Sequence, residues 1–512
     1  MIKDFDDSIL PLSRGEIIYF ISEIEQNKSA LNGSDREFLN FAKTKYFINR
    51  NFINLTGGDS SDFFPSLLQD SVKHLYRYID SNFTLTIDPT FRYKYIHYSE
   101  LKSNSNLFDL GGEFYGGYKD WFGFYFLGSN GIQAGNRSVA ELDKTVKHSY
   151  TFNVTKRNNF DFTLGYLKIK KDPFELEIGR QELFWGNGYI NKMIISDNAQ
   201  PFDFIKFRIE YKALNYTFLH GWLVHPSDIT YINEQYGENR SKISKYLAIS
   251  RLNYKISKKF SLSTSQMIIY ANRPIELAYL NPFLFWESAQ RSLNDLDNSL
   301  LNFDGRYLLT DGIELCGTMI FDDINFEKLF KGKWTSINNG FGWQLGSYLT
   351  YPYTWKSFDL KVEYMQFRPF LFTHPGLPGA LTYTNNGELI GSDLQPNSTR
   401  FNIECNLRSG YKLYTTFGFQ YTLHGENIFD VSGNLIKNVG GDVFQPVTIN
   451  DPDFAYLLDG RLQKELKIYT QLEYEILFGY YFTMHFSYSR LNLNPAVSND
   501  FYLWGEFKMA LN

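Results

Sequence analysis

The sequence predicts an all-β transmembrane barrel of about eighteen antiparallel strands, preceded by a small N-terminal α-helical bundle. Three observations favour this fold class: apolar and polar residues alternate along long runs, short and long connections alternate between those runs, and aromatic residues are abundant. Aromatic residues make up 18% of the 512 residues, although the mean hydropathy is only −0.33. In a barrel wall, lipid-facing and lumen-facing residues alternate, so their hydropathies cancel in a window average. A large soluble all-β protein is the alternative.

Residues 1–82 are predicted to form the helical bundle, as a cap or plug at one end of the barrel. Ser13 and Glu16 have the spacing of a capping box at the start of a helix over 13–27. Ser34 and Glu37 repeat that spacing before a second helix, and a third helix is expected after Asp70. The apolar stripes of the first and third helices consist of Ile17, Ile18, Ile21 and Ile24, and of Val72, Leu75, Tyr76 and Ile79. Three such short helices cannot bury their stripes alone, so we expect them to pack together; a simple N-terminal spacer is the alternative.

Residues 83–512 are predicted to form the barrel, because the hydrophobic period there is two. In 205–212, for example, Ile, Phe, Ile and Tyr alternate with Lys, Arg, Glu and Lys. The same pattern occurs in 358–364, 401–409 and 470–476. Such runs last about nine to eleven residues, which is the length of a strand that crosses a bilayer at a tilt. Strands of soluble sandwiches average about five or six residues.

The connections between the predicted strands are of two kinds. Tight turns occur near 170–173, 212–215, 257–259, 309–312 and 409–411. Long polar stretches occur at 182–203, 225–245, 270–298, 322–339, 368–398 and 423–455. This alternation is typical of a barrel with turns at one end and surface loops at the other. With this alternation, both chain ends lie at the turn end only if 469–490 is one long strand. Residues 148–158 form either a loop or a strand.

Charge and cysteine content exclude several classes of protein. The 51 basic and 56 acidic residues give a net charge of −5, and no basic stripe indicates nucleic-acid binding. Cys316 and Cys405 fall on opposite faces of their predicted strands, so we expect no disulfide between them. No cysteine–histidine spacing resembles a zinc site, and we expect no metal and no cofactor. Inward charges of both signs predict a dense polar network in a lumen that is wide enough for water.

The start of the chain, MIKDFDD, lacks the basic and apolar regions of a secretory signal. An outer-membrane protein needs such a signal, so we expect it to have been removed from the chain that this numbering describes. No run approaches the ~18 apolar residues of a membrane-spanning helix.

The long stretch after residue 178 carries a family resemblance. It reads Gly-Arg-Gln, then Trp-Gly-Asn-Gly, then Ile-Ile-Ser-Asp-Asn-Ala-Gln-Pro-Phe, and it resembles the Wzi-type capsule-assembly outer-membrane proteins. Similar pieces follow the family's order at 10–13, 280–282, 297–298, 321–323, 363–369 and 374. The resemblance implies a barrel in the Gram-negative outer membrane, with its helices at the periplasmic end and its long loops outside. It also implies non-catalytic, lectin-like binding of capsular or exopolysaccharide.

Loop side chains in these motifs are the candidate glycan contacts. Sugars present apolar C–H faces and many hydroxyl groups, so they bind where aromatic rings lie beside planar polar groups. The candidates are Arg180, Gln181, Trp185, Asn187, Asn198, Trp286, Asp297, Asn298, Asp322, Asp323, Arg368 and His374, and the other loop aromatics are Tyr189, Trp334, Tyr383 and Phe429. Packing of the loops into a lid is the alternative for each ring, and a structural or turn-forming role is the alternative for the charged residues. Trp185 is the leading contact.

Other functions remain open at the level of the sequence. No G-x-S-x-G, H-E-x-x-H or P-loop motif is present, so we expect no enzyme. The composition, rich in Phe, Tyr, Asn and Lys, resembles the Bacteroidota branch, in which similar proteins accompany gliding and adhesin-secretion systems. The alternatives are therefore an accessory barrel of a gliding or secretion complex, and a substrate-specific porin. Expected partners are the polysaccharide, outer-membrane lipid and a surface or secretion complex, with no nucleic acid.

Overall fold

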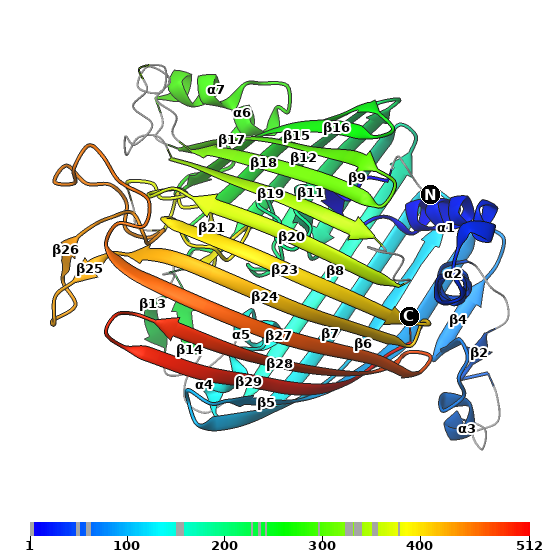
Figure 1. The fold of residues 1–512 in the computed structure, drawn as a ribbon. Helices are drawn as coiled ribbons and strands as arrows, with labels where there is room; N and C mark the ends of the chain where they lie inside the picture. Colours follow the sequence, from blue (N-terminus) through cyan, green and yellow to red (C-terminus); the bar gives the residue numbers. More distant parts are fainter. Residues whose placement is uncertain are drawn as a thin grey trace.

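Eighteen long antiparallel strands close into a barrel (Figure 1), as the sequence predicts. The computed structural model describes residues 5–47, 52–57, 63–149, 158–226, 229–233, 237–240, 243–294, 297–322, 331, 340–350, 357–376 and 379–511. The strands are β5 (Phe83–Tyr98), β6 (Ser103–Tyr118), β7 (Phe122–Gly135), β8 (Asn159–Lys171), β9 (Phe174–Arg180), β11 (Asp203–Tyr211), β12 (Leu214–Leu223), β15 (Lys245–Ser257), β16 (Phe260–Ala271), β17 (Asn298–Thr310), β18 (Ile313–Asp322), β19 (Gly340–Thr350), β20 (Phe358–Phe367), β23 (Ser398–Ser409), β24 (Leu413–Glu426), β27 (Arg461–Leu477), β28 (Tyr480–Asn492) and β29 (Val497–Ala510). β29 pairs with β5 and completes the circle, so the wall has no free edge.

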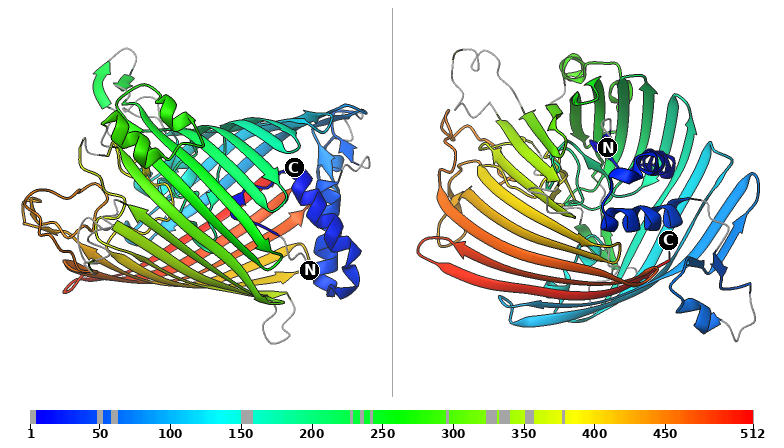
Figure 2. Two further views of the ribbon diagram at one scale, coloured as in Figure 1. Left: turned by 90° about the horizontal axis from the view of Figure 1, so that it is seen from above. Right: turned by 45° about the vertical axis from the view of Figure 1, so that its right-hand side comes forward.

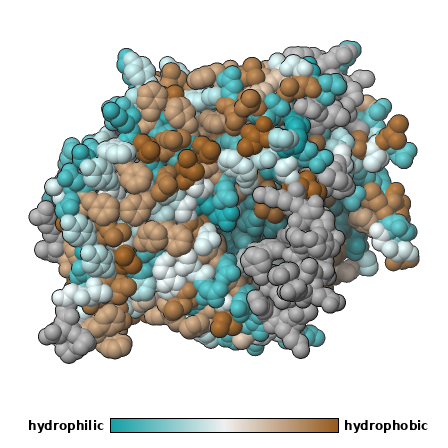
Figure 3. Space-filling view, turned by 180° about the vertical axis from the view of Figure 1, so that it is seen from behind, coloured by the Kyte–Doolittle hydropathy of each residue, from teal (hydrophilic) through white to brown (hydrophobic). Residues whose placement is uncertain are grey.

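The alternation of side chains along the strands is the physical basis of the wall. Along β11, Ile205 and Phe207 point outward, whereas Lys206 is buried inside against Glu177, 2.7 Å away. Apolar side chains gather on the outer wall, as seen from behind in Figure 3. All five predicted tight turns join neighbouring strands, for example β11 and β12. The predicted single strand over 469–490 is wrong: it is a hairpin of β27 and β28 that turns at Phe478–Gly479, where Gly479 has a φ of +81°.

The N-terminal helices are confirmed in part. α1 (Arg14–Gln26) starts at Ser13, whose Oγ accepts a hydrogen bond from the N–H of Glu16 at 3.2 Å, and the Glu16 carboxylate accepts one from the N–H of Ser13 at 2.7 Å. A short 3₁₀ turn, η1 (Lys28–Ala30), leads to α2 (Gly33–Tyr46). The N-cap of α2 is Asn32, not Ser34, because Asn32 Oδ1 accepts from the N–H of Asp35. Ser34 lies inside the helix, and its Oγ accepts from the N–H of Gly410.

The predicted third helix is wrong. Its residues form β3 (Lys73–His74), which pairs with β2 (Ile53–Asn54), and β4 (Tyr76–Ile79), while the short helix α3 (Phe63–Leu67) lies earlier in the chain. β29 covers β5 only from Thr90 to Tyr98, so the first part of β5 has backbone groups without a partner strand. β4 pairs with β5 over Thr84–Ile87 and supplies that partner. The need to satisfy the backbone of a neighbouring strand overrides the helical spacing of the side chains.

The N-terminal helices and both chain ends lie at the tight-turn end of the barrel. α1 and α2 cross this opening (Figure 2), and Ile21 of α1 shares a buried cluster with Leu39 and Ala42 of α2. Glu16 joins α1 to the inner wall through an ion pair with Arg208, 3.0 Å away. None of the helices in the described part of the chain is long and apolar enough to cross a membrane.

Acid should loosen α1 from the wall. Burial would raise the pKa of Glu16, but Arg208 and Ser13 lower it from 4.5 to about 2. Because the folded-state pKa is depressed, the stabilisation is present above pH 4.5 and is lost as the pH falls toward about 2. We expect a nitroxide label at exposed Tyr19 to become more mobile across this pH range. The change should be absent in Glu16→Gln, and equal mobility changes in both proteins would contradict the ion pair as the cause.

The long connections lie at the opposite end of the barrel. They contain α4 (Arg137–Ala140), α5 (Lys144–Lys147), β10 (Phe184–Trp185), β13 (Ile229–Asn233), β14 (Gly237–Arg240), α6 (Leu277–Leu280), α7 (Trp286–Leu293), β21 (Thr384–Asn385), β22 (Glu388–Leu389), β25 (Ile428–Phe429) and β26 (Leu435–Lys437). Two of these connections, 181–202 and 368–397, fold into the barrel and share a large buried apolar cluster with inward side chains of the wall. We call the first the inserted loop.

Candidate functional site

The inserted loop meets the N-terminal segment inside the barrel. β1 (Ile9–Leu10) pairs with β10, so that Ile9 lies opposite Trp185. The N–H of Gly186 donates to the carbonyl of Ser8 at 2.9 Å. Trp185 is fully buried by this arrangement. The two segments enter from opposite ends of the barrel and together fill part of the lumen.

Glu363 on β20 holds the tip of the inserted loop. Its carboxylate accepts hydrogen bonds from the backbone N–H groups of Tyr189 (2.9 Å), Ile190 (3.3 Å) and Asn191 (3.0 Å), and from the side-chain amide of Asn191 (2.8 Å). Gln344 donates to the carbonyl of Asn191 at 2.8 Å. One buried carboxylate therefore supplies the hydrogen-bond acceptor for backbone N–H groups that would otherwise have no partner in the lumen.

A buried charge pair also holds the same loop. Arg251 on β15 donates two hydrogen bonds of 2.7 Å to the carboxylate of Asp304 on β17, and both side chains are fully buried. Asn187 of the inserted loop donates to Asp304 at 2.5 Å. The bidentate geometry and the third donor satisfy the carboxylate without water.

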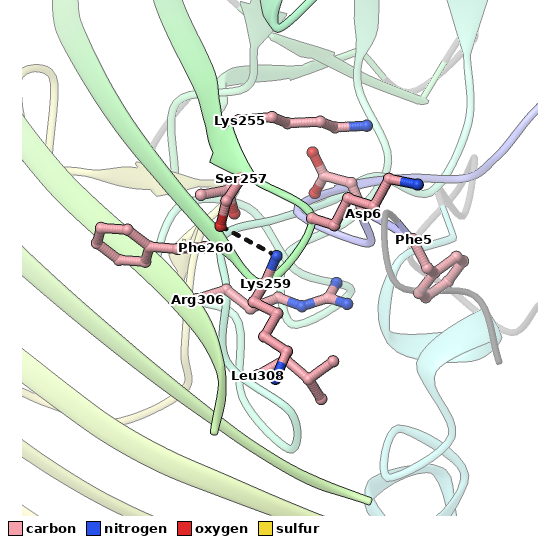
Figure 4. A pocket seen from close by; sticks show the side chains of 10 residues that line it. Phe5, Asp6, Lys255, Ser257, Lys259, Phe260, Arg306 and Leu308 are labelled. Atoms are coloured by element: carbon pink, nitrogen blue, oxygen red, sulfur yellow. Dashed lines mark hydrogen bonds between the residues drawn. The ribbon is translucent and has the colours of Figure 1, made fainter. Parts of the chain in front are cut away.

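The N-terminal segment is held by charge. In Figure 4 the carboxylate of Asp6 lies beside Lys255, with Arg306 below it, around a small cavity of about 20 Å³. Asp7 lies 3.4 Å from Arg306 and 3.6 Å from Lys192 of the inserted loop. Burial would raise the pKa of Asp6, but the Ser8 hydrogen bonds and the basic wall residues lower it overall.

The second inserted segment, 368–397, packs against the first. Tyr383 is fully buried; its ring stacks on Phe372, with centroids 5.2 Å apart, and its hydroxyl donates to the carbonyl of Ile194 at 2.7 Å. Inward wall residues near this end are apolar, among them Phe204, Leu219, Leu247, Ile249, Met267 and Ile269. The loops and this part of the wall thus form a hydrophobic core inside the barrel, which gives the loop end a packed lid.

Three segments that are distant in sequence meet on the lid and expose polar groups there. We call Lys144, Lys147, Asp197, Asn198 and Glu388 the mouth patch. Lys144 forms an ion pair with Asp197, Lys147 lies 2.7 Å from Glu388, and Asn198 donates to the carbonyl of Leu389 at 2.8 Å. These groups lie partly exposed at the surface. Ammonium, carboxylate and amide groups in one patch can donate to and accept from a ligand that is rich in hydroxyl groups.

A narrow cleft adjoins the mouth patch. It is lined by Gln181, Glu182, Ser196, Asp197 and Gln200 among others, and its volume of about 10 Å³ is enough for one water molecule or one hydroxyl group. Burial and the nearby Asp197 raise the pKa of Glu182. Within the described residues, no group of three His, Cys, Asp or Glu side chains is placed to hold a metal ion.

Several of the predicted contact residues fasten loops to the wall. Asn298 donates to the carbonyl of Leu381 at 2.9 Å, and Asp322 accepts from the N–H of Phe372 at 2.6 Å. His374 is buried and hydrogen-bonds the carbonyl of Pro375 at 2.8 Å. Trp185 and Asn187 are buried in the inserted loop, as described above.

The remaining predicted residues are spread around the loop end. Arg180 forms a bidentate pair with Asp203, at 2.9 and 3.0 Å, at the loop end of β9 and β11. Arg368 donates to the carbonyl of Ala455 at 3.1 Å. Trp286 and Asp297 belong to a connection that lies outside the barrel. Phe429 is exposed on β25, whereas Asp323 and Trp334 lie outside the described residues.

Of the predicted residues, Gln181 lines the cleft and Asn198 belongs to the mouth patch. Sequence reasoning missed Lys144, Lys147, Asp197 and Glu388. Single charged residues in polar loops carry no signal of their own, and α5 and β22 meet only because two connections fold across the same opening.

One family model and several solved structures match the chain. The model of the capsule assembly protein Wzi family matches residues 82–475. The solved structure of Wzi from Escherichia coli, described as an outer-membrane carbohydrate-binding β-barrel involved in group 1 capsule assembly, is similar with a TM-score of 0.58 and 13% identity, over 99% of this chain and 96% of that chain. OprD of Pseudomonas aeruginosa is similar with a TM-score of 0.45 and 11% identity, over 84% of this chain and 94% of that chain. No curated protein matches the chain.

Proposed function

The chain belongs to the capsule assembly protein Wzi family, and from this premise we propose that it is a non-catalytic, lectin-like protein of the outer membrane. In this proposal the barrel binds and anchors a capsular or exopolysaccharide at the cell surface. Residues 1–82 form the periplasmic cap and residues 83–512 form the barrel, whose long loops face the cell exterior.

The packed lid is the observation that carries the proposal. The inserted loop, the N-terminal segment and residues 368–397 occupy part of the lumen, where strand pairing, hydrogen bonds to the wall, the Lys192–Asp7 ion pair and an apolar core hold them. At its loop end, such a barrel offers its environment a surface rather than a pore. That surface is rich in ion-paired and amide side chains, which suits hydroxyl-rich polymers.

We assign the direct glycan contacts to the mouth patch together with Gln181. The predicted residues that are buried, such as Trp185, Asn187 and Asp322, act indirectly in this proposal, because they set the shape of the lid. Arg180 at the rim is a further contact for acidic sugars.

Replacing Lys147 with alanine should weaken polysaccharide binding about tenfold, because a hydrogen bond from a charged group contributes about 1.5–3 kcal/mol. Binding is measured by titrating surface polysaccharide, purified from the native host, into the detergent-solubilised protein. Lys437→Ala is the matched control, since Lys437 also forms an exposed ion pair, 2.8 Å from Asp459, but lies in another loop. Equal affinities of the two variants would place the contacts elsewhere.

Deletion of the gene tests the anchoring role in cells. We expect the deletion strain to shed its surface polysaccharide into the medium while synthesis continues. Unchanged retention, combined with no binding by the purified protein, would end the proposal.

An accessory role in a surface or secretion complex is the second candidate, and one observation favours it. Residues 427–460 project from the loop end and expose large apolar side chains, namely Val431, Ile436, Ile449 and Tyr456. Exposed apolar groups away from a membrane indicate protein contacts. Recovery of a defined protein assembly with the tagged chain, without glycan binding, would favour this role. The porin alternative is weakened by the packed lid at the loop end and is tested by the conductance measurement described in the Discussion.

A further inference from the structure

The outward residues of the wall form an apolar band that is interrupted in one sector. On β11, Ile205 points outward and is apolar and exposed. Its partner on the neighbouring strand β12 is the polar residue His220. On the other side of the sector, Gln266 of β16 pairs with Leu301 of β17, whose outward neighbour Phe303 is exposed. The polar residues on β12, β15 and β16 therefore lie in the same rows as apolar residues on the flanking strands.

Polar side chains in such rows would face hydrocarbon in a bilayer. The outward polar residues of the sector include His220, Ser250 and Gln266, and Ser250 pairs directly with Gln266. A buried amide or hydroxyl group without a hydrogen-bond partner costs about 1–3 kcal/mol or more. The sector consequently requires a protein cover that supplies partners.

The connection between β16 and β17 supplies this cover. It lies on the outside of the barrel (Figure 1), and we call residues 275–293, which include α6 and α7, the wall cover. Gln266 donates to the carbonyl of Leu284 at 2.8 Å and accepts from the N–H of Trp286 at 3.1 Å. Ser250 and Tyr216 both donate to the carbonyl of Pro282, at 3.3 and 2.9 Å.

The inner side of the wall cover is well packed. Tyr279 and Trp286 are fully buried in one cluster with Phe218, Ala248 and Ile268 of the wall. His220 hydrogen-bonds the hydroxyl of Tyr270 at 2.7 Å in the same region. The cover is thus a fixed part of the outer surface.

The outer side of the wall cover carries many large apolar side chains beside the exposed polar residues Asn281, Ser288 and Arg291. Phe283 is 81% exposed and Leu277 is 77% exposed. The other large apolar side chains exposed on it are Ile275, Leu280, Leu284, Phe285 and Leu293. The wall cover thus presents apolar side chains farther from the barrel axis, in the sector where the wall itself has polar outward residues.

We propose that the wall cover is embedded in one leaflet of the membrane, with its exposed apolar side chains against lipid acyl chains. Continuity with the apolar band on both flanks favours lipid over a protein partner, because the same rows of the wall face lipid on either side. Amphipathic helices lie in this way at the boundary between head groups and acyl chains. The inference rests on the membrane location in the proposed function.

The test uses environment-sensitive NBD labels on single cysteines in a Cys316→Ser/Cys405→Ser background, reconstituted into phosphatidylcholine vesicles. Phe283→Cys reports on the wall cover, and Leu345→Cys, an exposed outward position on β19, reports on the barrel wall. Ile436→Cys, which is 66% exposed on β26, is the matched aqueous control. Phe283 is 81% exposed, and its substitution removes only the surface stacking of its ring on Tyr216, with centroids 5.8 Å apart, so we expect the fold to stay intact.

We expect the label at position 283 to emit at shorter wavelength than the label at 436, and to lose most of its emission to lipids carrying a doxyl group. The label at 345 should behave like that at 283. If doxyl lipid quenches the label at position 345, whereas only aqueous iodide quenches the label at position 283, the inference is overturned. If neither is quenched by lipid, the barrel does not insert and the proposed location fails as well.

Discussion

Replacing Asp304 with alanine should lower the free energy of unfolding by about 3–5 kcal/mol, because it leaves a buried arginine without its counter-charge. Arg251 is fully buried, and both of its terminal nitrogens donate hydrogen bonds to this carboxylate. Asn187 loses its partner in the same step. Unfolding in urea, followed by tryptophan fluorescence in detergent micelles, measures the loss.

Two further variants make this result specific. The double replacement Arg251→Met/Asp304→Leu removes both charges and should recover most of the stability, since an apolar pair of similar volume often equals a buried ion pair. Asp459→Ala breaks the exposed pair with Lys437 and should cost less than about 1 kcal/mol. A loss of that small size in Asp304→Ala would contradict the arrangement of the buried pair.

Replacing Glu363 with alanine should release the tip of the inserted loop and open the lumen. The variant loses the acceptor of three backbone N–H groups and one amide, and each buried donor left unpaired costs about 1–3 kcal/mol. In planar bilayers we expect current steps from Glu363→Ala and none from the unmodified protein. Lys192, which lies in the same loop and is mostly buried, should become a site of trypsin cleavage.

Glu404→Ala is the matched control for this experiment. Glu404 is a carboxylate of the wall that pairs with Lys361 at 2.8 Å, also on the wall. Its loss should leave the inserted loop in place, and we expect no current steps from this variant. If Glu363→Ala also gives no current steps and trypsin does not cleave it at Lys192, Glu363 does not hold the loop.

The sequence by itself determined those features whose physics is local. The capping box of Ser13 and Glu16 needs only neighbouring residues, and it is present as predicted. The period of two along 205–212 reflects the two faces of one strand, and it identifies the barrel wall and its tight turns. The family resemblance, carried by motifs in the family's order, is confirmed over residues 82–475.

Local patterns failed where a partner distant in sequence made the decision. Residues 72–79 have helical spacing, but β4 forms because β5 leaves part of its edge unpaired by β29. The apolar parity of 469–490 continues through a two-residue turn, so parity alone does not reveal the hairpin of β27 and β28.

Only the tertiary structure decided where the loops lie. The stretch around Trp185 reads as an exposed aromatic loop, yet it lies inside the barrel, because inward apolar residues such as Leu247 and Met267 give it a core. Trp286 reads in the same way, yet it covers polar residues on the outer wall. In a strand, the period of two assigns each side chain to the inner or the outer face, but no such period exists in a connection. The surroundings of a side chain in a connection depend on which wall residues still lack a packing or hydrogen-bond partner, and those residues come from strands far away in the sequence.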